Sequence, residues 1–193
     1  ALPEASLREL LVVLDSVPVA DQTMSGMPSL PDQVGARIAS IEGAARRLAP
    51  NHRQILEAIS SLLVRARADF VPSSDIELLV KRLERPLLKL ALQDLNFPGM
   101  PDHPARQVLN LIEQFAVAAD DKGKIFDAKL QRFLSLLVDR VCTRADDDPG
   151  VFETVRDSLE RVLQPILQIR RTRVARLQEA SEGRECIRAA RDR

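Results

Sequence analysis

The chain has 193 residues, and its 28 lysine and arginine residues are balanced by 28 aspartate and glutamate residues, so the formal net charge is zero. This balance argues against a sequence-independent nucleic-acid-binding protein, which needs an excess of basic charge. Two histidines and the two distant cysteines, Cys142 and Cys186, are too few for a Cys/His zinc site and do not form the framework of a small secreted protein, so we expect a reducing, cytoplasmic setting.

Apolar residues recur at intervals of three and four along the chain, which is the period of an amphipathic helix. The predicted fold class is therefore all-α, a helical bundle of about six to seven helices. The first helix is expected over 5–15, followed by a loop or flexible linker over 16–30. A second helix is expected over 31–48. A third is expected from Asn51, which fits a capping box with Gln54.

The fourth predicted helix begins after Ser74, which fits a capping box with Glu77. Apolar residues between 76 and 92 cover more than half of its circumference, so we expect this helix at the centre of the bundle. Pro86 lies inside the helix and predicts a bend between Arg82 and Pro86, because proline lacks a backbone N–H and clashes with the preceding turn.

Two further helices are separated by short connections rich in glycine, proline and aspartate. The connector 96–102 precedes a fifth helix that begins at Pro104, where proline suits the first turn. The turn 120–123 precedes a sixth helix, which is expected to direct the apolar residues of 125–141 inward.

The last helix is predicted from 151 to about 190, with Asp148 as its N-cap, Pro149 at its first position and a proline kink at Pro165. Such a length is far above the usual value for globular proteins. It marks the C-terminal part of the chain as unusual.

We divide the chain into three parts. Residues 1–30 are a short helix and a flexible linker, residues 31–169 are the helical bundle, and residues 170–193 are an Arg-rich helical extension that leads to a further domain of a longer protein. No uninterrupted apolar run of about 18 residues occurs, so no membrane span is expected.

Residues 102–106 read Asp-His-Pro-Ala-Arg and combine an acid, an imidazole and a guanidinium within two turns. As a functional site, His103 and Arg106 would bind a small ligand or anion at a helix N-terminus, with Asp102 orienting His103 for acid–base chemistry. As a structural feature, His103 or Asp102 caps the helix that Pro104 begins. No second catalytic group lies nearby in the sequence, which favours the structural interpretation.

No familiar catalytic or cofactor-binding motif occurs, whether a phosphate loop, a nucleophile elbow or a metalloprotease helix. The acidic run 146–148 lacks the spacing of a calcium loop and fits a helix-capping role better. We therefore predict no enzymatic activity, no metal and no cofactor.

Residues 170–193 carry eight arginines and four acids, a net charge of 8 − 4 = +4, which leaves −4 on the preceding residues. The extension is either a solvated helix or a docking surface for an acidic partner or a phosphate-bearing ligand, both of which suit the arginine fork. If it docks, we expect Arg170, Arg171 and Arg173 to contact the partner. Residues 32–67 could form a helix-turn-helix, but the arginines in this segment are dispersed, which argues against DNA binding.

Two short patterns carry a family resemblance: the run 83–94 around Pro86, with Phe97 after it, and His103-Pro104-Ala105-Arg106. Over 79–112 the chain resembles a bacterial family known as domain of unknown function 1631, with looser similarity to about residue 170 and none in the first 70 residues. The resemblance implies one piece of a large, mostly helical, cytoplasmic protein. Some relatives are labelled thymidine phosphorylase, but the signatures of such an enzyme are missing here. Others are linked to cyclic di-GMP signalling through a separate β-barrel domain.

These observations favour a non-enzymatic regulatory or protein-interaction module, which the resemblance associates with cyclic di-GMP signalling. The expected partners are another protein or other domains of the same chain, with self-association through the C-terminal helix and a cyclic dinucleotide as further options. Two hypotheses compete with this one. The first is a small-ligand or anion-binding domain, or an enzyme, centred on His103 and Arg106. The second is a purely structural helical scaffold.

Overall fold

The computed structural model describes residues 3–17, 30–40, 46–148 and 150–191, with side chains described as far as residue 179. Within these ranges the chain is all-α, as predicted, and its only β-type pairings are two isolated bridges. The long helices are α1 (Leu7–Ser16), α2 (Leu30–Ala39), α3 (Pro50–Ala68), α4 (Asp75–Gln93), α5 (Pro104–Gln114), α6 (Ala128–Arg144) and α7 (Val151–Arg191). Two short 3₁₀ helices, η1 (Phe97–Gly99) and η2 (Phe115–Ala118), flank α5.

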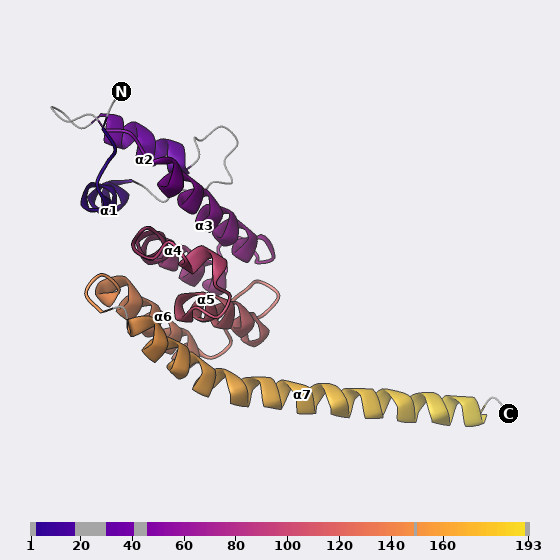
Figure 1. Ribbon diagram of the computed structural model, residues 1–193. Helices are drawn as coiled ribbons and strands as arrows, with labels where there is room; N and C mark the ends of the chain where they lie inside the picture. Colours follow the sequence, from indigo (N-terminus) through magenta and orange to yellow (C-terminus); the bar gives the residue numbers. More distant parts are fainter. Residues whose placement is uncertain (1–2, 18–29, 41–45, 149, 192–193) are drawn as a thin grey trace.

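Helix α4 lies at the centre of the bundle and packs against α1, α3, α5 and α6, which confirms its predicted place (Figure 1). Its N-terminus is capped by Ser74, whose hydroxyl accepts a hydrogen bond from the Glu77 N–H at 3.2 Å. In a capping box, the Glu77 carboxylate would accept a hydrogen bond from the N–H of Ser74. Here it accepts from the N–H of Ser73, one residue earlier, at 2.6 Å. Most of the apolar side chains of α4 are buried, which makes it the main source of the core.

Pro86 lies inside α4, and the helix is continuous through it. Because proline has no N–H, the carbonyl of Arg82 cannot accept the usual hydrogen bond from residue 86. The Cys142 thiol of α6 donates to that carbonyl instead, at 3.4 Å. A contact from a neighbouring helix thus replaces the bond that proline removes.

The second predicted helix is too long, because α2 ends at Ala39. Residues 46–48 instead lie beside the N-terminal segment: the N–H of Ala5 donates to the carbonyl of Arg47 at 3.0 Å, and Arg47 forms an ion pair with Glu4 at 2.6 Å. The linker expected over 16–30 falls mostly outside the described residues, as does Pro149. Helix α1, which precedes that linker, packs against α2 and α4.

Two predicted helix starts are also wrong. Helix α3 begins at Pro50 after Ala49, which makes no side-chain cap, so the capping box expected at Asn51 does not form. Proline already has the backbone angle of a first helical residue and begins the helix there. Helix α6 begins at Ala128, because the Asp127 carboxylate caps the N–H of Lys129 at 2.7 Å, and this leaves Ile125 in the preceding loop.

A buried ion pair joins α3 to α4. The Nη1 atom of Arg67 lies 2.7 Å from the Oε1 atom of Glu84, and only 10% and 5% of the two side chains are exposed. Charges are seldom removed from water to this extent unless they are paired. The pair therefore links the two helices at a buried position and helps to fix α3 against α4.

Candidate functional site

His103 is the N-cap of α5, as the structural interpretation of residues 102–106 predicts. Its Nδ1 atom accepts a hydrogen bond from the N–H of Ala105 at 3.1 Å, and its ring meets Phe97 edge to face at a centroid distance of 4.8 Å. Accepting at Nδ1 requires the neutral imidazole with its proton on Nε2, which lies 3.8 Å from a carboxylate oxygen of Asp94. Burial lowers the pKa of His103, although the charges of Asp94 and Glu153 oppose the shift.

Arg106 lies one turn into α5 and reaches back to the connector. Its Nη1 atom donates to the carbonyl of Pro98 at 3.1 Å, which ties α5 to η1. Burial raises the pKa of Glu113, while the positive charge of Arg106 acts in the opposite direction. The polar groups of His103 and Arg106 are thus bonded to nearby backbone, and their joint role in binding a ligand stays a prediction.

The lowered pKa of His103 predicts that acid destabilises the fold. As the pH falls, the unfolded chain takes up a proton near the ordinary pKa of 6.5, before the folded chain does. The contribution of neutral His103 to stability is therefore complete above that value and is lost as the pH falls towards the folded-state pKa. Urea unfolding between about pH 7.5 and 5.5 should show this slope in the wild type. The slope should be weaker in His103→Asn, which can cap but cannot titrate, and an equal slope in both would exclude this role.

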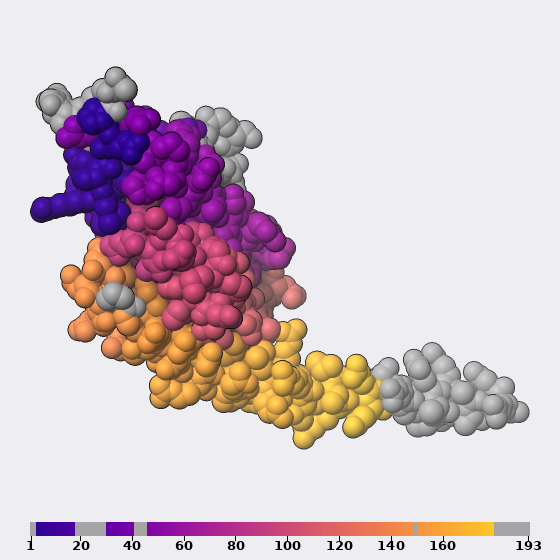
Figure 2. All heavy atoms as spheres, viewed as in Figure 1, coloured from indigo at the N-terminus to yellow at the C-terminus, as the bar shows by residue number. Residues whose placement is uncertain are grey.

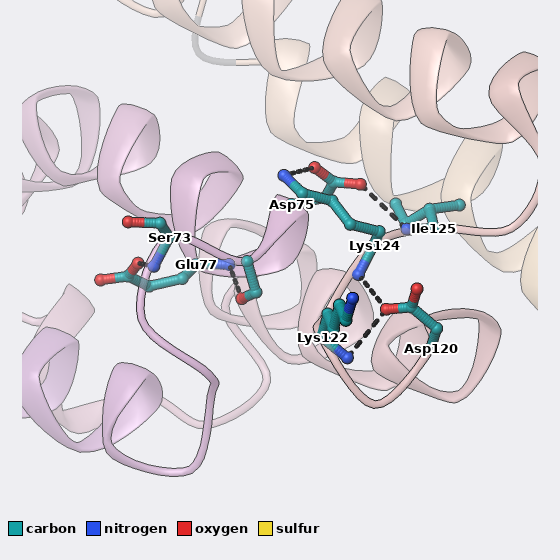
Figure 3. Close-up of polar contacts among 8 residues, drawn as sticks. Ser73, Asp75, Glu77, Asp120, Lys122, Lys124 and Ile125 are labelled. Carbon is teal, nitrogen blue, oxygen red and sulfur yellow. Dashed lines mark hydrogen bonds and ion pairs between the residues drawn. The ribbon is translucent and has the colours of Figure 1, made fainter.

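The loop 120–125 packs onto the N-terminus of α4 (Figure 3). Its sequence does not match a phosphate-binding loop. The buried carboxylate of Asp75 accepts from the N–H of Ile125 at 2.9 Å and from the Lys124 Nζ atom at 3.0 Å. Asp120 organises the loop by accepting from the backbone N–H groups of Lys122 and Lys124. Burial alone would raise the pKa of Asp75, but these hydrogen bonds hold it below its ordinary value. The hydrogen bonds that the Asp75 carboxylate accepts therefore hold the loop 120–125 against the bundle.

Helix α7 has 41 residues, in agreement with the predicted length, and its first part packs against α5, α6 and η2. Beyond residue 167 the helix leaves the body, and every side chain from Gln168 to Glu179 is exposed (Figure 2). The predicted partner-binding residues Arg170, Arg171 and Arg173 all lie in this projecting part. We call residues 168–191 the α7 extension.

A cleft of about 510 Å³ lies between α1, α4 and α6, and sequence analysis did not predict it. Four basic side chains of α4 line it, namely Lys81, Arg82, Arg85 and Lys89. Their spacing along α4 places them on one helical face beside Pro86. This spacing is the sequence feature from which the basic side of the cleft could have been predicted. The acidic groups of the cleft come from α1, from α6 and from the turn that follows α6, so only the folded chain brings the basic and acidic side chains together.

Among the described residues, no group of three or more histidine, cysteine, aspartate or glutamate side chains is placed to hold a metal ion. The acidic run 146–148 is engaged in contacts within the chain. Asp146 pairs with the distant Lys89 at 2.7 Å, and Asp148 accepts a hydrogen bond from the N–H of Gly150 at 3.0 Å. None of the described helices combines the length and the apolar character that crossing a membrane would require.

Comparison with protein families finds one matching model, described as "Protein of unknown function (DUF1631) 2nd domain", over residues 1–148. The match includes the first 70 residues, where we expected no resemblance, and it ends just before α7. Neither the curated proteins nor the solved structures contain a match. Since the matching model spans more than half of the chain and includes the His-Pro-Ala-Arg segment, the chain belongs to the DUF1631 family.

Proposed function

We propose that this chain is a non-enzymatic protein-interaction module of a larger bacterial cytoplasmic protein, and that it binds its partner through the α7 extension. The observation that carries the proposal is the contrast between the two parts of α7. Val155, Leu159 and Leu163 are fully buried against the body, whereas Ile169 and Leu177 are 69% and 61% exposed. A single helix without tertiary contacts is marginally stable in water, so a partner that covers the extension would stabilise it.

The helical register indicates which face of the extension binds. From the buried Leu163, steps of three and four residues lead to Ile166, Arg170, Arg173 and Leu177. These positions continue the face that the body covers in the first part of α7. Two arginines therefore occupy positions that would meet a partner, with an apolar residue beyond them.

The proposed partner surface is acidic and partly apolar. Arginine forms paired hydrogen bonds with carboxylates, while Leu177 needs an apolar contact. A parallel pairing of two copies of α7 would bring Arg170 against Arg170 and Arg173 against Arg173, and such like-charge contacts are unfavourable. Another protein, or another domain of the longer chain, is thus a better partner than a second copy.

Site-specific photocrosslinking tests this proposal in the cells that produce the longer protein. A photoreactive phenylalanine analogue at Leu177 should give a discrete crosslinked product. The matched control is Leu136 on α6, which is 62% exposed against 61% for Leu177 and should give none. Equal crosslinking at both positions would contradict the proposal. A product containing a second copy of the chain would overturn the choice of partner.

A link to cyclic di-GMP signalling is the finer part of the proposal, and it rests on the family resemblance. The module would then act on a partner in that signalling system, because the β-barrel domain linked to it in relatives is a separate unit. Calorimetric titration with cyclic di-GMP should give the same heat for the wild type and for Arg173→Glu, because the proposed partner of the α7 extension is a protein. Saturable binding that is lost in Arg173→Glu would instead assign the nucleotide to the extension.

A further inference from the structure

We propose that the cleft between α1, α4 and α6 binds a small anion that carries a phosphate group, with Arg85 as its main contact. This binding site is separate from the α7 extension and goes beyond the proposed function. In Figure 1, α4 lies between α1 and α6. Five of the residues that line the cleft come from α4. The volume of about 510 Å³ lies within the usual range for small-molecule sites.

The carboxylates of the cleft are engaged by two of its basic side chains. Lys89 lies 2.9 Å from Asp15 and 2.7 Å from Asp146, so this lysine engages two of the three acids in the cleft. Burial alone would lower the pKa of Lys89, but the two acids raise it, which keeps the amine charged. Arg82 engages the third acid, Asp139. The acids of the cleft are therefore committed to Lys89 and Arg82.

Arg85 differs from these two basic side chains in its partner. Its Nη2 atom donates to the backbone carbonyl of Val17 at 3.2 Å, a neutral acceptor at the end of α1. Within the part of the chain that the structure describes, no carboxylate forms an ion pair with Arg85. A guanidinium carries five N–H donors in a planar fork, and one carbonyl uses only one side of it. Arg85 thus has both the charge and the donors for an anionic ligand.

The charges of the cleft indicate the chemistry of the ligand. Its lining has four basic and three acidic side chains, a net charge of 4 − 3 = +1. Lys81 is one of the four and pairs with Glu77 at 3.3 Å, so Arg85 is the basic side chain that supplies charge for a ligand. A phosphate offers three acceptor oxygens to the planar fork of a guanidinium, one more than a carboxylate. Pro86 and Ala145 supply an apolar wall for the rest of the molecule.

Calorimetry with inorganic pyrophosphate and with adenosine monophosphate, at constant ionic strength, tests the proposal. The wild type and Arg140→Gln, an exposed arginine of α6 outside the cleft, should bind at least one of these probes. Arg85→Gln should bind it at least about tenfold more weakly. Binding of both probes indicates that the phosphate alone is recognised, whereas binding of the nucleotide alone indicates that the cleft also reads the organic part.

Arg85→Lys keeps the proposal testable if Arg85→Gln does not fold, because lysine retains the charge and loses the fork. Arg85→Lys should bind more weakly than Arg140→Lys. Equal affinity of the Arg85 variants and their controls would overturn the proposal, as would the absence of binding at millimolar probe. A negative result here leaves docking through the α7 extension unaffected, since those residues lie outside the cleft.

Discussion

Replacing Glu84 with glutamine is expected to lower the free energy of unfolding by about 3 kcal/mol. The substitution keeps the shape of the side chain but removes the charge that faces Arg67, whose side chain is only 10% exposed. A buried guanidinium that loses its counter-charge retains its desolvation cost without the compensating attraction. Urea unfolding followed by circular dichroism measures the change.

Glu57→Gln is the matched control for this prediction. Glu57 lies on α3, is 55% exposed on its side chain and sits 3.9 Å from Arg53, so its loss should cost less than about 1 kcal/mol. The double replacement Arg67→Met with Glu84→Leu should recover most of the lost stability, because apolar residues of similar volume often replace a buried pair. A small effect of Glu84→Gln, comparable with that of Glu57→Gln, would show that the pair does not fix α3 against α4.

Gly123→Ala is expected to destabilise the fold by at least about 2 kcal/mol. Gly123 has a φ of +76°, and a Cβ atom added there would lie 2.3 Å from the Cβ of Ser74 and 3.2 Å from its Cα. The loop would have to move away from α4. That movement would break the hydrogen bond from the Asp75 N–H to the carbonyl of Gly123, which is 2.9 Å long.

Gly99→Ala provides the comparison, because no atom lies within 4 Å of a Cβ added there. It should change the free energy of unfolding by less than about 1 kcal/mol. Thermal unfolding of the two variants side by side measures both effects. If Gly123→Ala is as stable as Gly99→Ala, the loop 120–125 does not need its close contact with Ser74.

Much of the fold was predictable because helix signals are local. The period of three and four identified α4 and α7, Ser74 and Pro104 marked two helix starts, and His103 was one of two predicted caps for α5. The errors arose where a distant contact decided a local outcome. Residue 47 bonds to the N-terminal segment rather than extending α2, which no pattern around it indicates.

The candidate sites were predictable only in part. The arginines of the α7 extension could be identified from the sequence because arginine becomes much more frequent from residue 170 onward within a single helix. The cleft did not, because Arg85 meets the carbonyl of Val17 across 68 positions of sequence, and Lys89 meets Asp146 across 57. The partner of Arg67 was equally hidden: Glu84 lies on the next helix, and its burial depends on how the two helices pack. Side-chain partners from different helices follow from packing rather than from spacing.

The most direct test of the central proposal is affinity purification of the longer protein, with quantitative mass spectrometry, for three versions of the chain. The first is the wild type. The second carries glutamate at Arg170, Arg171 and Arg173. The third carries glutamate at Arg132, Arg140 and Arg144, which are exposed on α6 and give the same change in net charge. We predict that the α6 variant retains the partner found with the wild type and that the α7 variant loses it. Retention of the same partner by the α7 variant, with self-association also unchanged, would contradict docking through α7.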